Sequence, residues 1–177
     1  QGITVLKTYS IFISEFYFGL LLLWLILILA GSLFLKRRVF TLIKRIKEPI
    51  LLAFSTSSSE AAFPKTMTEL ERFGCKDKIV SFVLPLGYSF NLDGSMMYMT
   101  FASLFIAQSY GIHIDIPTQL SMLLVLMLTS KGIAGVPRAS LVVIAGTLAT
   151  FNIPEAGLAL LLGIDPLLDM GRSATNV

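Results

Sequence analysis

Long apolar runs alternate with short basic and polar stretches along the whole chain. The clearest run is residues 16–35, which are 20 positions without a charge. At the rise of an α-helix this run matches a hydrocarbon core roughly 30 Å thick, so the pattern predicts a transmembrane helix over about residues 9–35. Residues 36–48 then carry six Lys and Arg residues and one acid. This excess of positive charge places that end of the helix on the cytoplasmic side.

Two later apolar stretches are too short or too interrupted to cross a bilayer. Residues 50–64 have a serine-rich middle, and residues 118–151 are split by a polar, glycine-containing segment at 130–137. Irregular backbone is tolerated at membrane depth only where it is buried in protein or lines a cavity. The pattern therefore predicts two re-entrant helical hairpins, the first entering from the cytoplasmic side and the second from the outside.

A broken crossing lies between the two hairpins. Residues 79–110 are long enough to span the bilayer, and Asp93 is their only charge. Their middle, residues 91–95, reads Asn-Leu-Asp-Gly-Ser, which favours a turn where an ordinary helix would continue. A last helical segment, from about residue 156, returns toward the cytoplasm.

The two hairpin tips resemble each other. Residues 57–64 and 130–137 both begin with Ser, carry Ala at the fifth place and end with Pro at the eighth. The sixth residue is small and the seventh apolar in both tips. Opposite-facing copies of one unit that meet at broken helices are typical of secondary transporters.

Composition supports the membrane interpretation and argues against nucleic acid as a partner. Hydrophobic residues make up 55% of the chain and charged residues 14%, against about 25% charged in soluble domains. The net charge of +3 comes from basic residues beside apolar spans, and no basic face with interleaved aromatics suggests nucleic acid. The single Cys75 excludes a disulfide within the chain, and His113 is expected in a solvated loop. The chain begins at Gln1 without a visible signal peptide, so we expect an internal piece of a longer protein.

The expected fold is an all-α integral membrane protein with two opposed re-entrant hairpins. Its expected parts are a transmembrane helix and basic loop at 1–38, hairpin 1 at 39–76, the broken helix at 77–112, hairpin 2 at 113–154 and a final transmembrane helix at 155–177.

Three charges in apolar segments are candidates for function. Asp93, Asp169 and Arg172 each cost at least ~2.5–3.5 kcal/mol at the bilayer centre, so each should face a partner or a wet cavity. Asp169 and Arg172 are three residues apart, on one helical face. They could form a plain intrahelical ion pair. With Asn176 one turn further on, they could also bind a solute that has both an ammonium and carboxylates.

Two polar segments complete the candidate chemistry. The break at residues 91–95 offers carbonyl and carboxylate oxygens to a hard cation, although a structural kink is the alternative. The hydroxyls of Ser58 and Ser59 at the first tip suit an anionic group, although small residues also serve close helix packing.

These motifs resemble the dicarboxylate/amino acid:cation symporter family, the relatives of the glutamate transporters. The resemblance rests on the serine-rich tip before Ala-Ala-Phe-Pro, the Pro-Leu-Gly that leads into Asn-Leu-Asp-Gly, the second tip and the helix from Asp169 to Asn176. It implies a moving transport domain that works by an elevator motion. It also implies a trimeric scaffold built from helices that this chain does not include.

The resemblance implies two sets of binding residues. The residues expected to bind the acidic amino acid are Ser58, Ser59, Ser95, Gly135, Val136, Asp169, Arg172, Ser173 and Asn176. The residues expected to bind the coupling ion, Na+ or H+, are Gly87, Ser89, Asn91, Leu92, Asp93, Ser130, Ile133 and Asn176. No other cofactor is expected.

The sequence departs from the sodium-coupled pattern at three positions. Leu92 stands where Met is usual, Ser95 stands where Thr is usual, and Lys131 lies at the second tip beside an expected sodium site. The proton-coupled bacterial members resemble the tip and the break more closely. The leading hypothesis is a multi-pass symporter of the cell membrane, for glutamate or aspartate.

Several alternatives remain open at this point. C4-dicarboxylate carriers and neutral amino acid or cystine carriers are neighbours in the same family. An ion channel is the alternative from another class. An enzyme is not expected, since no nucleophile–base pair is evident.

Overall fold

The elements that the structure describes are all helices. The computed structural model describes residues 2–131, 133 and 137–177. The helices are α1 (Gly2–Leu35), α2 (Arg38–Thr56), α3 (Ser59–Phe73), α4 (Asp77–Phe90), α5 (Asp93–Ser109), α6 (Ile116–Thr129), α7 (Ala139–Thr150), the 3-10 turn η1 (Glu155–Gly157), α8 (Leu158–Leu161) and α9 (Asp165–Thr175).

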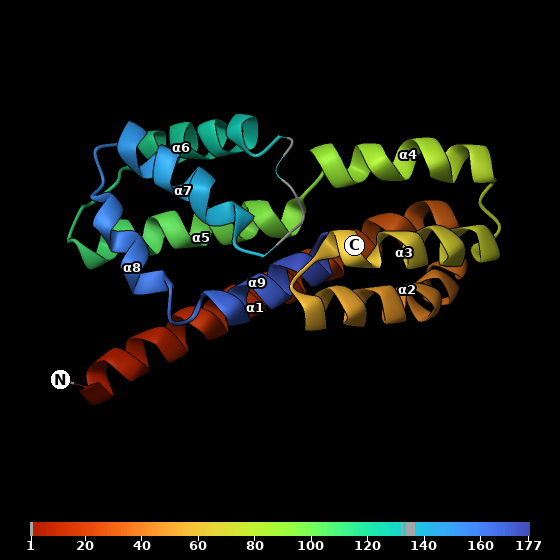
Figure 1. Ribbon diagram of the computed structural model, residues 1–177, viewed down its shortest axis with the longest axis horizontal. Coiled ribbons are helices and arrows are strands. Elements are labelled where there is room, and N and C mark those ends of the chain that lie inside the picture. The colour runs from red at the N-terminus through yellow and green to blue at the C-terminus, as the bar shows by residue number, and fades with distance from the viewer. Residues whose placement is uncertain (1, 132, 134–136) are drawn as a thin grey trace.

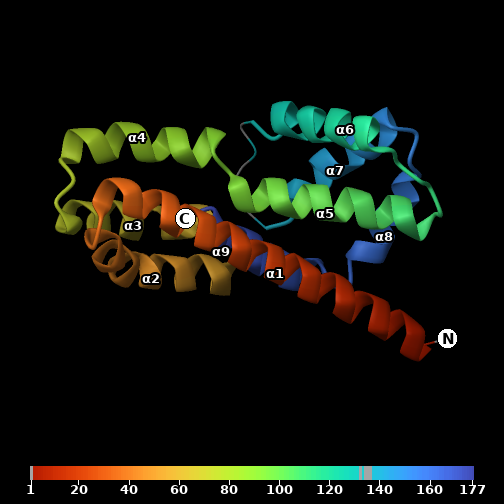
Figure 2. The same cartoon turned by 180° about the vertical axis from the view of Figure 1, so that it is seen from behind.

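Helices α2 to α4 form one group and helices α5 to α8 form another (Figures 1 and 2). In the first group α2 and α3 pack as an antiparallel pair, and α4 lies beside α3. In the second group α6 and α7 pack together and both contact α5. In Figure 1 helix α1 runs below the second group and then passes behind α3 of the first group, and α9 lies between α1, α2 and α5, where the two groups meet. Helices α1 and α9 therefore both contact the two groups of helices.

Helix α1 is the one described helix that is long and apolar enough to cross a membrane. It begins at Gly2, earlier than the predicted residue 9, because residues 2–8 continue the helix in spite of Lys7. Phe12, Phe16 and Leu20 form a narrow buried stripe at helical spacing. Most of the remaining apolar side chains are exposed on this chain, which is unlike the core helix of a soluble protein.

The hydrophobic core lies between α1, α5, α7 and α9. Tyr98 and Met99 of α5 are fully buried there, together with Ile144 of α7 and Leu168 of α9. Two hydrogen bonds from α1 hold α9 along its length, from Tyr17 to the Leu167 carbonyl (2.6 Å) and from the Trp24 indole to the Thr175 hydroxyl (2.9 Å). This packing fixes the buried face of α9.

The two hairpin tips differ in structure although their sequences resemble each other. At the first tip the chain turns within two residues, because Ser57 adopts a left-handed conformation (φ 50°) and Ser58 caps α3 by accepting a hydrogen bond from Ala61 N (3.3 Å). Pro64 then lies inside α3. At the second tip α6 ends at Thr129, and α7 begins only at Ala139, after Pro137 and Arg138.

The last segment departs from the single helix that the sequence predicts over 155–177. It consists of η1, α8 and α9, with residues 162–164 outside the helices. Gly163 and Pro166 account for the interruption, since Gly favours irregular backbone and Pro is suited to the first turn of the helix that follows. The break separates α8 from the helix that carries Asp169 and Arg172.

Candidate functional site

One face of α9 gathers four polar side chains in the interior. Asp169, Arg172, Ser173 and Asn176 follow one another at helical spacing, and all four are buried. Arg172 is fully buried, and its Nε donates a hydrogen bond to Asp169 Oδ1. A buried guanidinium needs compensation for its lost hydration, so this face is expected to be held by further polar contacts.

Ser95 of α5 supplies part of that compensation. Its hydroxyl accepts hydrogen bonds from Arg172 Nη1 (3.2 Å) and from Asn176 Nδ2 (2.9 Å). Its backbone N–H donates to Asn176 Oδ1 at 3.2 Å. The structure thus brings together four of the predicted substrate residues from two helices, with Ser95 lying 77 positions before Arg172 and 81 before Asn176 in the chain.

Close backbone approach at Gly94 makes these contacts possible. A Cβ atom at Gly94 would run into the Arg172 carbonyl and would lie 2.8 Å from Thr175 Cβ and 2.9 Å from Asn176 Oδ1. The glycine in the predicted break therefore has a packing reason: it lets α5 and α9 meet directly.

A second carboxylate, Asp165, lies one turn before Asp169 on the same helix and is fully buried. Its Oδ1 accepts a hydrogen bond of 2.5 Å from the Tyr98 hydroxyl, and its Oδ2 lies 3.4 Å from Arg138 Nε. Sequence reasoning did not place Asp165, Tyr98 or Arg138 in the site. The i, i+4 spacing of Asp165 and Asp169 could have indicated the first of them.

Arg138 connects the second hairpin to both carboxylates of α9. Its backbone N–H donates to Asp169 Oδ2 (3.0 Å), while its side chain pairs with Asp165. Its φ of 64° is left-handed, a conformation that is uncommon for a residue other than glycine. The chain holds this conformation at the start of α7, where both contacts are made.

The remaining predicted substrate residues lie at the hairpin tips and on α9. Ser58 is half-buried as the cap of α3. Ser59 and Ser173 are fully buried, and neither hydroxyl has a hydrogen-bond partner among the described residues. Gly135 and Val136 lie outside the described residues. Buried hydroxyls are normally satisfied, so the two serines are suited to a ligand or to water.

Apart from Asn176 at the end of α9, the predicted cation residues lie at two places, in and around the break between α4 and α5 and at the second tip. Their backbone carbonyls already accept hydrogen bonds within the chain: Gly87 from Asn91 N (2.8 Å), Leu92 from Met96 N (3.0 Å) and Ser130 from Ile133 N (3.3 Å). A carbonyl has a second lone pair, so each keeps capacity for a cation.

The side chains at the break are more accessible than those of the α9 cluster. Asp93, the first residue of α5, is half-buried, and so is Ser89, whereas Asn91 is exposed. Across the described residues, no three His, Cys, Asp or Glu side chains gather into a metal site. The oxygens at the break are those of the backbone carbonyls, the Asp93 carboxylate and the side chains of Ser89 and Asn91.

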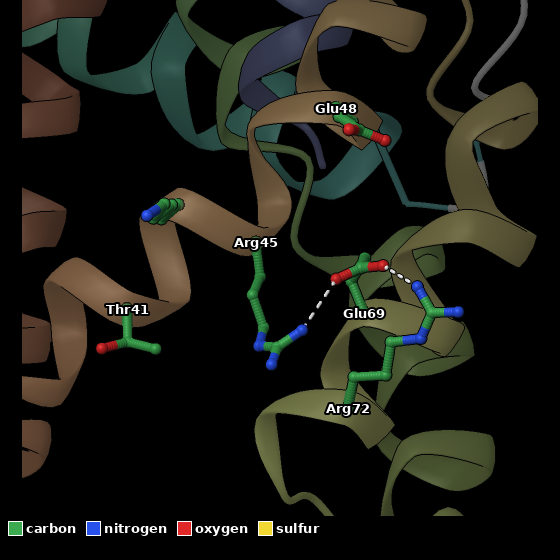
Figure 3. A pocket seen from close by; sticks show the side chains of 6 residues that line it. Thr41, Arg45, Glu48, Glu69 and Arg72 are labelled. Atoms are coloured by element: carbon green, nitrogen blue, oxygen red, sulfur yellow. Dashed lines mark hydrogen bonds and ion pairs between the residues drawn. The ribbon is translucent and has the colours of Figure 1, made fainter.

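A separate cavity of about 460 Å³ lies between α2 and α3 (Figure 3). It is lined by Thr41, Lys44, Arg45, Glu48, Glu69 and Arg72. Glu69 lies between two arginines, 3.4 Å from Arg45 and 2.7 Å from Arg72, as the dashed lines in Figure 3 mark. Glu48 pairs with Lys65 at 2.6 Å. The Arg45–Glu69 and Glu48–Lys65 pairs link α2 to α3, whereas the Glu69–Arg72 pair lies within α3.

Buried charges at broken and closely packed helices, beside an apolar helix of membrane-spanning length, are typical of secondary transporters. The comparison with known families agrees with this class. The chain belongs to the sodium:dicarboxylate symporter family, whose family model matches residues 1–177.

Curated relatives carry three kinds of name. The chain is 57% identical over 139 residues to the proton/sodium-glutamate symport protein of Geobacillus stearothermophilus. The aligned segment covers 78% of this chain and 33% of that protein. The chain is 46% identical over 161 residues to the proton/glutamate-aspartate symporter of Escherichia coli, covering 91% and 36%. It is 42% identical over 177 residues to the C4-dicarboxylate transport protein of Laribacter hongkongensis, covering 99% and 40%. The chain thus spans between a third and two fifths of these relatives' length.

Proposed function

We propose that this chain is the transport core of a secondary active symporter for an acidic amino acid, glutamate or aspartate. The observation that carries the proposal is the buried cluster of Asp169, Arg172, Ser95 and Asn176. Asp169 would bind the ammonium of the solute, and Arg172 would bind its side-chain carboxylate. The hydroxyls of Ser59 and Ser173, which have no hydrogen-bond partner among the described residues, are suited to a second carboxylate.

The coupling ion would act at the break between α4 and α5. Asp93 is the acidic side chain in that break, and a carboxylate at membrane depth needs a cation or a proton to balance it. The relatives' names include both sodium and proton coupling. The ion would be Na+ or H+, held by Asp93 and the neighbouring backbone oxygens.

The membrane arrangement is part of the same proposal. The α2–α3 and α6–α7 pairs would be re-entrant hairpins from opposite sides, and the domain would move as an elevator against a scaffold that this chain does not include. The protein would be a multi-pass protein of the cell membrane and would assemble as a trimer through that scaffold. The α2–α3 pair in particular supports a hairpin, since its two arms are antiparallel and joined by ion pairs.

Uptake by the full-length protein in liposomes would test the function. Sodium and proton gradients are imposed separately, with glutamate, aspartate and succinate as solutes. We expect glutamate and aspartate to accumulate against at least one gradient. If only succinate accumulates, the protein would be a C4-dicarboxylate carrier instead. If the solutes only flow downhill, without coupling to an ion gradient, the protein would be a channel.

Asp93→Asn tests the coupling role, with Asp77→Asn as its control. Asp77 is an exposed acid at the start of α4 and makes only a local hydrogen bond to Ser81 among the contacts described (3.1 Å). We expect Asp93→Asn to lose gradient-driven uptake while Asp77→Asn keeps it. If Asp93→Asn inserts normally and keeps full uptake, Asp93 has a structural role only.

A further inference from the structure

A lysine of the second hairpin reaches the break between α4 and α5. Lys131 Nζ donates a hydrogen bond of 2.6 Å to the carbonyl of Phe90, the last residue of α4. Asp93, three residues further on, lies within electrostatic range of the same ammonium. The break is therefore contacted by a positive charge that belongs to the chain itself.

The surroundings of that ammonium are those that suit a cation. The last carbonyls of a helix lack partners within the helix and carry the negative end of its dipole. Unwound carbonyls of this kind bind cations in transporters with broken helices. A lysine ammonium is a compact charge with three donors, so it can occupy such a place.

The Lys131 side chain is also directed toward the broken helix. A lysine on a membrane-exposed helix normally extends its charged end toward water or the headgroups. Lys131 comes just after α6 and is exposed, and its charged end contacts a carbonyl 41 positions away in the sequence, that of Phe90 at the end of α4. Asp93, three residues after Phe90, begins α5. The Lys131 side chain thus links the start of the second tip to the broken helix.

We propose that the ammonium of Lys131 is a tethered cation, which takes a place at the break that a free sodium ion would otherwise occupy. The inference rests on the proposed symport function and specifies its cation side. With the ammonium in place, the contact between Lys131 and the break would not require a bound sodium ion. Removing the charge should then create a requirement for sodium at this place.

Three variants of the full-length protein separate the charge from the packing. Lys131→Met keeps the length of the side chain and removes the charge, Lys131→Gln keeps a donor for the Phe90 carbonyl, and Lys131→Arg keeps the charge. Lys78→Met is the control, because Lys78 is an exposed lysine in the first turn of α4, far along the helix from the break. Lys131→Gln preserves the test if Lys131→Met does not fold.

The first readout is glutamate uptake into liposomes in sodium-free medium and at increasing sodium. We expect Lys131→Met and Lys131→Gln to fall about tenfold or more below the wild type without sodium, a factor worth about 1.4 kcal/mol, and to recover as sodium rises. Lys131→Arg and Lys78→Met should follow the wild type. Equal loss at all sodium concentrations, or no change in sodium dependence, would overturn the proposal.

The second readout does not depend on transport. In detergent, a ligand that binds the folded state raises the unfolding temperature, so sodium should stabilise Lys131→Met and Lys131→Gln more than the wild type. The same sodium effect in all variants would contradict the inference even if uptake is normal. If the wild type shows no gradient-driven uptake, the proposed function fails, and this measurement still decides whether Lys131 replaces a cation.

Discussion

Replacing Arg172 with Cys should change which solutes the protein carries. The guanidinium is fully buried and contacts the Asp169 carboxylate and the Ser95 hydroxyl. If it also binds the side-chain carboxylate of the solute, its removal leaves that carboxylate buried without a partner. Such a loss costs roughly 3–5 kcal/mol, which is about two to four decades of affinity at 1.4 kcal/mol each. A small neutral amino acid has no such group and should be bound as before.

Asp169→Ser should have the opposite selectivity. Asp169 accepts hydrogen bonds from Arg172 and from the backbone of Arg138, so its charge is already balanced in the absence of a solute. Removing it takes away the anion that an ammonium needs, while Arg172 remains. Glutamate and serine should lose affinity, and a diacid without an ammonium should be spared.

Competition assays with glutamate, serine and succinate on both variants measure this selectivity. Arg72→Cys is a matched control, because Arg72 also pairs with an acid three residues earlier, Glu69 (2.7 Å), but its side chain is 65% exposed. An exposed pair is worth about 0–1 kcal/mol, so the control should keep both selectivity and stability. Equal loss for all three solutes in both site variants would mean that the pair is structural, and the substrate assignment would fall.

Three further predictions concern stability and topology. Gly94→Ala should lower the free energy of unfolding by about 1–3 kcal/mol, because its Cβ meets the backbone of α9. Gly87→Ala should leave this free energy unchanged, because no described atom lies within 4 Å of the added Cβ. Thermal unfolding in detergent compares the two variants. Tyr98→Phe should cost about 1–3 kcal/mol in the same assay, because it removes a hydrogen bond to a buried carboxylate; an unchanged midpoint would contradict that bond. Lys44→Cys should resist an impermeant thiol reagent added outside, and His113→Cys should react with it; external labelling of Lys44→Cys would refute the hairpin topology.

Features with a local cause could be predicted from the sequence. The turn-forming residues 91–95 indicate an interruption, and the structure ends α4 at Phe90 and begins α5 at Asp93. The serine-rich tip likewise separates α2 from α3 within two residues. In both places the interruption depends on the conformational preferences of adjacent residues, which a sequence displays directly.

Features that depend on packing between distant segments could not be predicted. The Asp165 carboxylate lies between Tyr98 and Arg138, which come from two other helices or their ends. Nothing in the spacing of these three residues indicates that their helices meet. The helix starts at the two tips were not evident from the sequence either, because α3 begins within its motif and α7 only after it. The turn at the first tip is stabilised by a local cap, whereas Arg138 at the second makes its contacts to α9.

The charges on α9 form two linked pairs, and their linkage bears on the nature of the solute. Asp169 binds the side chain of Arg172 and the backbone of Arg138, while Asp165 binds the side chain of Arg138. Both carboxylates are buried, but the Arg138 side chain is 59% exposed. An exposed partner is held weakly, whereas a buried carboxylate without a partner is costly. A cationic group that enters the site can therefore take over part of the balance that Arg138 provides. The ammonium of an amino acid would meet this demand and a plain diacid would not, so the charge balance agrees with the proposed amino acid substrate.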